Sequence, residues 1–105
     1  MLINKADIRS WAATGFPGIE RSLFRNTAQG GRASFVRLAA GSRFPRHTHQ
    51  GDEEVVVIAG QVSIGGAELQ AGDYLHTEAG EEHDVVALSD AVIFVSSRKP
   101  TPLVE

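Results

Sequence analysis

Two histidines and a nearby carboxylate are the residues of this sequence whose types and spacing best suit chemistry. His47 and His49 lie two positions apart, and Glu53 follows four positions after the second histidine. Residues two apart on a strand point to the same face, so both imidazoles can reach one metal ion while Arg46 and Thr48 face away. The spacing therefore predicts a chelating pair.

A turn and a second strand are needed to position the carboxylate. Gln50–Asp52 has the composition of a turn, and the apolar run Val55–Ile58 is typical of a returning strand. This return brings Glu53 back beside the two histidines, and one further nitrogen from elsewhere in the chain would complete the ligand set. The rival carboxylate, Glu54, points to the opposite face of the same strand, so we assign it to the surface.

At these positions the sequence resembles the first of the two motifs of the cupin family. The matching residues are Gly41, His47, His49, Glu53 and Gly60. The second motif is matched at Gly72, Gly80 and His83. Glu78 stands where the family has proline, and Ala87 stands where it has asparagine. The resemblance implies that His83 is the fourth metal ligand.

Within the cupins the sequence is most similar to the ChrR-like group, whose anti-sigma-factor members bind zinc. The likeness spans residues 16–97, and it is carried by the segments PGIERSLFRNTAQGG, LAAGSRFPRHTHQGDEE and QAGDYLHTEAGEEH. The resemblance implies an all-β fold, the double-stranded β-helix or jelly roll of the RmlC-like cupins. The metal would lie inside this barrel.

The length of 105 residues fits one small domain with one core. We expect a single cupin domain over residues 1–105, with a core over residues 16–97 and a flexible C-terminal tail over residues 98–105. Pro100 and Pro102 disfavour extension of the last strand into this tail. The chain has no cysteine, so any metal must be held by nitrogen and oxygen.

Short runs bounded by glycine and proline predict strands along most of the chain. Besides the strands of the first motif, we expect strands at Ile8–Trp11, Ile19–Asn26, Ala33–Leu38, Gln61–Ile64, Ala67–Leu69, Tyr74–Thr77 and Ala91–Val95. Gly65 and Gly66 suit a two-residue hairpin. If His83 points inward, Val85 and Ala87 do so too and form an apolar lining. We leave His76 out of the ligand set as a structural histidine.

Hydropathy and charge indicate whether the protein contacts a membrane or a nucleic acid. No apolar stretch approaches the roughly 20 residues of a membrane span, and Asp7, Arg9 and Ser10 interrupt the N-terminus before a signal-peptide core can form. We expect a cytoplasmic protein without membrane contact. The net charge is −3, with most basic residues before His47 and most acidic ones after it. Neighbouring strands of a barrel would neutralise these charges, so we expect no nucleic-acid partner.

Two outward-facing residues predict self-association. Val56 and Ile58 lie on the strand face opposite to Glu53, where they would be exposed to water on a monomer. We therefore expect a homodimer.

Three imidazoles and one carboxylate would leave one or two metal positions for water or substrate. We expect one divalent ion per chain, with iron, manganese or zinc ahead of nickel or cobalt. The resemblance implies a metal-dependent enzyme with dioxygenase- or isomerase-like activity on a small oxygen-bearing organic molecule. Two alternatives remain. One is a ligand- or stress-sensing module related to the cupin domain of zinc-binding anti-sigma factors. The other is a non-catalytic barrel that its metal stabilises.

Overall fold

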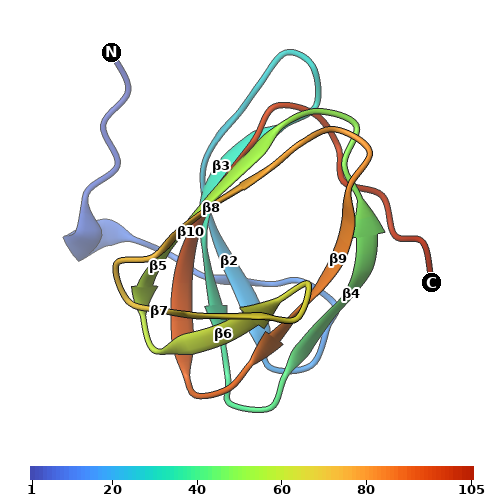
Figure 1. Cartoon of the computed structure of the whole chain (residues 1–105). Helices are drawn as coiled ribbons and strands as arrows, with labels where there is room; N and C mark the ends of the chain where they lie inside the picture. Colours follow the sequence, from blue (N-terminus) through green and yellow to red (C-terminus); the bar gives the residue numbers. More distant parts are fainter.

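Two antiparallel β-sheets face each other across one core (Figure 1). The structure, a computed structural model, describes residues 1–105. The six-stranded sheet has the order β1 (Ala12–Ala13), β2 (Ile19–Asn26), β3 (Arg32–Leu38), β10 (Ala91–Ser97), β5 (Glu53–Ala59), β8 (Tyr74–Thr77). The four-stranded sheet has the order β4 (Arg43–Thr48), β9 (Glu82–Ala87), β6 (Gln61–Ile64), β7 (Ala67–Gln70). The all-β prediction is confirmed.

The barrel interior is filled by side chains that alternate along the strands. Eleven buried apolar residues make one cluster, which consists of Ile19, Val36, Leu38, Val55, Val57, Val62, Ile64, Val85, Ala87, Ala91 and Ile93. Their spacing of two within each strand follows from the pleat, which turns successive side chains to opposite faces. The inward direction expected for Val85 and Ala87 is therefore confirmed.

The interior has an apolar end and a polar end. At the apolar end, Ile19 pairs with Leu38, and Leu38 pairs with Ala91. At the polar end, Ser97 of β10 lies between Arg32 of β3 and Glu53 of β5, and Glu53 pairs with Thr77 of β8. Directly paired residues of neighbouring strands share a sheet face. One row of the sheet therefore brings polar side chains into the barrel.

Glycines form two of the tight turns. Gly65 and Gly66 both have positive φ, 58° and 83°, and they join β6 to β7 in the expected hairpin. Gly60 has a φ of 75°, and a Cβ atom there would lie 2.0 Å from the carbonyl oxygen of Asp90. This turn at the apolar end has no room for a side chain.

The N-terminal segment differs from the prediction. The strand expected at Ile8–Trp11 is wrong, because the structure has a 3-10 turn, η1, at Ala6–Ile8 and then the two-residue β1. Side-chain stacking holds the segment instead of a backbone ladder. The guanidinium of Arg9 lies 4.9 Å from the ring centre of Phe35, and Arg37 lies 4.2 Å from that of Trp11.

The C-terminal tail, expected to be flexible, runs beside β4 (Figure 1). The carbonyls of Pro100 and Pro102 accept hydrogen bonds from the amides of Gln50 and Thr48, and the amide of Val104 donates to Arg46. Proline lacks an amide hydrogen but keeps its carbonyl, so these prolines can line an edge strand although they cannot continue β10. The tail therefore belongs to the wall of the barrel.

The outer face of the six-stranded sheet carries exposed apolar side chains. Ile58 is 47% exposed and Tyr74 is 56% exposed, and Val56 also lies on this face. The outward direction of Val56 and Ile58 is as expected, and the homodimer inferred from it stays a prediction. None of the helices has the length and apolar character needed to cross a membrane.

Candidate metal centre

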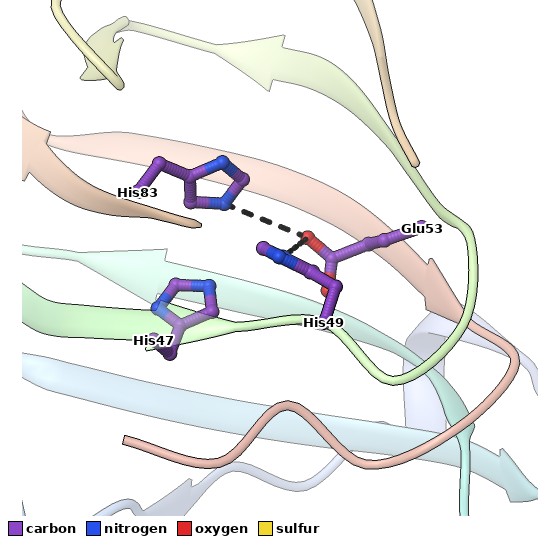
Figure 2. A group of neighbouring side chains, drawn as sticks. All are labelled: His47, His49, Glu53 and His83. Carbon is purple, nitrogen blue, oxygen red and sulfur yellow. Dashed lines mark ion pairs between the residues drawn. The ribbon is translucent and has the colours of Figure 1, made fainter. Parts of the chain in front are cut away.

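Three strands bring four side chains together at the polar end (Figure 2). His47 on β4 pairs directly with His83 on β9. His49 follows the last residue of β4, and Glu53 is the first residue of β5. The short turn between them reverses the chain and connects β4 of one sheet to β5 of the other. His49 and Glu53, which are four positions apart in the sequence, therefore face each other. The residues predicted from spacing and from the family resemblance therefore lie in one cluster.

The cluster has the dimensions of a single-ion site. All four residues are buried, and their candidate ligand atoms lie within 4.8 Å of one another. Nε2 of His49 is 3.3 Å from Oε1 of Glu53, and Nε2 of His83 is 3.9 Å from the same oxygen (Figure 2). An ion with bonds of about 2.0–2.2 Å to nitrogen and oxygen is of the size that such a group can enclose.

Backbone carbonyls orient two of the imidazoles. Nδ1 of His49 lies 2.7 Å from the carbonyl oxygen of Glu81, and Nδ1 of His47 lies 2.9 Å from that of Pro45. A neutral imidazole that donates its Nδ1 hydrogen to a carbonyl keeps its lone pair on Nε2. In the neutral form, both rings would present an unprotonated Nε2 to the centre, which is the usual arrangement of metal-binding histidines.

Burial and the neighbouring charges act differently on the three imidazoles. Burial, followed by the charges of His49 and His47, lowers the pKa of His83 to about 4. Burial also lowers the pKa of His47. Burial acts in the same direction on His49, but the Glu53 carboxylate and the Glu81 carbonyl outweigh it and raise the pKa of this imidazole. Two of the three histidines are thus held neutral at neutral pH, as metal binding requires.

One buried atom of the cluster lacks a hydrogen-bond partner within the protein. Nε2 of His49 is inaccessible to solvent and makes no hydrogen bond, although Glu53 lies within ion-pair distance. Buried polar atoms in proteins are almost always paired. A divalent ion would satisfy this atom and would also separate the carboxylate from the imidazoles. The donor set of three nitrogens and one carboxylate fits such an ion.

The rival residues lie outside the cluster. Glu54 is exposed on the opposite face of β5, as the strand period predicts. The side chain of His76 is 40% exposed, and its Nε2 lies 3.3 Å from a carboxylate oxygen of Asp52. Arg43 and Arg46, which precede the histidines, pair on the surface with acidic residues of β9. For these two arginines the expected pairing of early basic residues with later acidic ones is seen.

A cavity of about 350 Å³ adjoins the cluster. Its wall includes His47, Glu53 and His83, together with apolar side chains such as Val55 and Val85. The tail closes part of the wall through Thr101, Pro102 and Leu103. Ala87, expected beside Val85 in this lining, packs in the apolar cluster and is not part of the cavity wall. The cavity gives His47, Glu53 and His83 access to a compact ligand, whereas His49 is not part of the wall.

A larger hollow of about 860 Å³ lies on the surface at the apolar end. Its lining includes Phe16, Pro17 and Ala59, with Glu20 and Arg37 paired to each other. None of the clustered histidines reaches it. The larger hollow is therefore not the candidate functional site. The smaller cavity is, because candidate metal-ligating side chains line it.

Sequence reasoning missed two cavity residues and the tail. Arg21 and Arg32 line the cavity beside the cluster. The period of two contained the signal, because Arg21 is two residues after inward-facing Ile19, and Arg32 is an even number of residues before inward-facing Leu38. The contribution of the tail had no local signal, since it depends on pairing with β4.

Known proteins with this architecture include an acetylacetone dioxygenase and an anti-sigma factor. An acetylacetone dioxygenase from Acinetobacter johnsonii is 16% identical, with a TM-score of 0.84 over 100% of this chain and 77% of that chain. A putative acetylacetone dioxygenase from Methylibium petroleiphilum is 22% identical, with a TM-score of 0.87 over 100% of this chain and 86% of that one. ChrR of Rhodobacter sphaeroides, solved in complex with SigE, is 22% identical, with a TM-score of 0.76 over 89% of this chain and 50% of that chain. At these identities the likeness establishes the fold.

Sequence comparison identifies the family. The DNA damage-repair/toleration protein DRT102 of Arabidopsis thaliana is 35% identical over 86 residues, which are 76% of this chain. The chain spans 27% of the length of that protein. The family model described as the ChrR cupin-like domain matches residues 1–101. The chain is thus a member of the ChrR cupin-like domain family.

Proposed function

We propose that the protein binds one divalent metal ion through His47, His49, Glu53 and His83 and is a metal-dependent enzyme. Its substrate would be a compact, oxygen-bearing organic molecule that chelates the ion, and its reaction dioxygenase- or isomerase-like. The observation that carries the proposal is the buried cluster with an unpaired histidine nitrogen, opening on a cavity of about 350 Å³. The acetylacetone dioxygenases that share the fold support this substrate class.

Different residues of the site would bind the metal, orient its ligands and line the substrate cavity. The three histidines and Glu53 would hold the ion, and the Glu81 and Pro45 carbonyls would keep His49 and His47 in the ligating tautomer. A bound divalent ion supplies Lewis-acid polarisation of substrate oxygens. Val55 and Val85 contribute apolar surface to the cavity wall, which would lower the local dielectric and strengthen the electrostatic attraction between the site and a bound substrate.

The donor set of the cluster is compatible with several divalent metals. Imidazole and carboxylate suit iron, manganese and zinc, and also nickel and cobalt, and metal availability usually decides among them. Elemental analysis of untagged protein, purified with and without added metals, identifies the ion. We expect one equivalent per chain. Alanine replacement of any of the four ligands should remove most of it, whereas Glu54→Ala and His76→Ala should retain it.

Activity is tested with the ferrous protein. Oxygen uptake in the presence of acetylacetone and of enediol compounds should exceed that of the Glu53→Ala protein, which serves as the metal-deficient control. Exclusive occupancy by zinc, together with no oxygen uptake, would exclude the dioxygenase version and leave a zinc-dependent isomerase or hydrolytic activity. Retention of a full equivalent of metal by all four alanine variants would contradict the proposed site.

A second candidate function is a ligand- or stress-sensing module. The match to the ChrR cupin-like family and the shared fold with ChrR favour it. Such a module would prefer zinc, would show no turnover with the same compounds, and would lose thermal stability when the metal is chelated. Thermal unfolding with and without a chelator, run beside the oxygen-uptake assay, separates the two functions.

A further inference from the structure

Two arginines, on β2 and β3, contribute to the cavity that adjoins the metal cluster. Arg32 of β3 lies in the same row of the sheet as Ser97 and Glu53, so it shares the inner face with the carboxylate ligand. Arg21 of β2 pairs with inward-facing Val36, which places it deeper in the barrel. Both arginines contribute to the cavity wall. The cavity therefore has the metal cluster on one side and guanidinium groups on another.

Arg21 lacks a partner within the protein. Its Nε atom is inaccessible to solvent and has no hydrogen-bond partner, and no ion pair includes Arg21 or Arg32. Burial, followed by the like charge of Arg32, lowers the pKa of Arg21, whereas Glu53 raises it. A guanidinium stays charged at neutral pH in proteins. An unpaired buried donor with this charge costs stability unless a ligand satisfies it.

The charge of the cavity favours an anion. A divalent ion would carry more charge than its single carboxylate ligand, and both guanidiniums add to the excess. The remaining wall is largely apolar, with Val36, Val55 and Ile93 between the two groups. A planar guanidinium matches the two oxygens of a carboxylate, and charge-assisted hydrogen bonds of this kind are strong in a water-poor site.

We propose that Arg21, assisted by Arg32 at the rim, binds the carboxylate of a substrate whose oxo or enol oxygens meet the metal. This rests on the proposed function, because it assigns the second end of the same substrate. The substrate class is a compact oxo-carboxylate. The cavity volume of about 350 Å³ is near the lower end of ligand pockets and limits the molecule to this size.

Two probes that differ by one carboxylate test the proposal. Acetylpyruvate has the chelating dicarbonyl unit of acetylacetone, with a carboxylate in place of one terminal methyl group. Calorimetric titration of the zinc-loaded protein, in which no redox turnover occurs, gives both dissociation constants. We expect acetylpyruvate to bind at least about tenfold more tightly, a factor that one charge-assisted hydrogen bond can supply.

Matched variants show which arginine causes the preference for acetylpyruvate over acetylacetone. Arg21→Gln should reduce it to near unity, and Arg32→Gln should reduce it in part. Arg25→Gln, which removes an exposed charge from the same strand, should leave it unchanged. Equal binding of the two probes by the wild-type protein overturns the proposal, as does a preference that survives in the Arg21→Gln/Arg32→Gln double variant.

A spectroscopic titration separates this proposal from the metal-site proposal. The NMR resonance of the Arg21 Nε–H group should shift when acetylpyruvate is added and should stay in place when acetylacetone is added. Both results are expected in the metal-free protein as well as in the metal-loaded protein. The absence of this shift contradicts the arginine site even if metal binding holds. Conversely, the shift without any metal-dependent binding supports the arginine site and contradicts the proposed function.

Stability distinguishes ligand binding from a structural role of Arg21. Arg21→Gln removes a half-buried charge whose Nε donor is unpaired, so the ligand-free variant should have an unfolding temperature equal to or above that of the wild type. An arginine that served only to balance Glu53 would give the opposite result, a lower unfolding temperature with the probe preference retained. That outcome would overturn the proposal.

Discussion

Ile19, Leu38 and Ala91 meet at one end of the barrel, whereas Arg32, Ser97 and Glu53 meet at the other, although β3 and β10 contribute to both groups. The apolar end gains free energy from burial, at about 25 cal/mol per Å² of apolar surface. The polar end buries groups that cost free energy when unpaired, such as Nε2 of His49. The apolar end therefore stabilises the fold, and this allows the other end to contain buried polar groups without partners.

The largest effect is expected at a turn of the apolar end. In Gly60→Ala the new Cβ atom would lie 2.0 Å from the Asp90 carbonyl, and the positive φ adds strain, so we expect a loss of about 4 kcal/mol. Gly51→Ala at the polar end meets only the flexible Lys99 side chain at 3.1 Å and should cost less than about 1 kcal/mol. Urea unfolding measures both, and equal losses would contradict the contrast between the two ends.

A core truncation tests the same end without changing the backbone. Leu38 is 1% exposed, so Leu38→Ala should lower the free energy of unfolding by about 3 kcal/mol through lost burial and a cavity. Leu88, which is 45% exposed, is the matched control, and Leu88→Ala should cost less than about 0.5 kcal/mol. A loss below about 1 kcal/mol for Leu38→Ala would mean that the apolar end does not dominate stability.

Metal should convert the polar end from a cost into a stabilising region. Zinc at about 100 times its dissociation constant should stabilise the folded state by about 2.7 kcal/mol, because it binds only the folded chain. His83→Ala should abolish this gain, and His76→Ala should preserve it, since His76 pairs with Asp52 outside the cluster. Thermal unfolding at fixed zinc concentration gives the comparison, and a gain retained in His83→Ala would remove His83 from the ligand set.

The strands of both ends were predictable, and so was the choice between neighbouring carboxylates. Alternation along β5 assigned Glu53 to the interior and Glu54 to the surface without any structure. The strand expected at Ile8–Trp11 failed because Arg9 and Trp11 are held by rings and charges of distant strands. Arg21 was missed as a cavity residue because its charge suggested a solvated position. Its separation of two residues from inward-facing Ile19 nevertheless indicated the interior.

The smallest effect concerns the attachment of the tail. Arg43 and the Arg46 amide hydrogen-bond to the Glu105 carboxylate and lower its pKa from 4.5 to about 2. The contribution of this contact is present above pH 4.5 and is lost as the pH falls toward 2. At pH 6, Glu105→Gln should therefore speed hydrogen exchange of the Val104 amide severalfold and leave that of Val57 unchanged. Glu20→Gln is the control, and equal exchange in both variants would show that Glu105 does not hold the tail.

The pairing of the tail with β4 also bears on self-association through backbone groups. β4 is the outermost strand of the four-stranded sheet, and without the tail the amides of Thr48 and Gln50 and the carbonyl of Arg46 would face water. Such a row of open groups is a template for pairing with a strand of another molecule and for aggregation. The tail satisfies these groups through the carbonyls of Pro100 and Pro102 and the amide of Val104, so β4 itself is not an open edge.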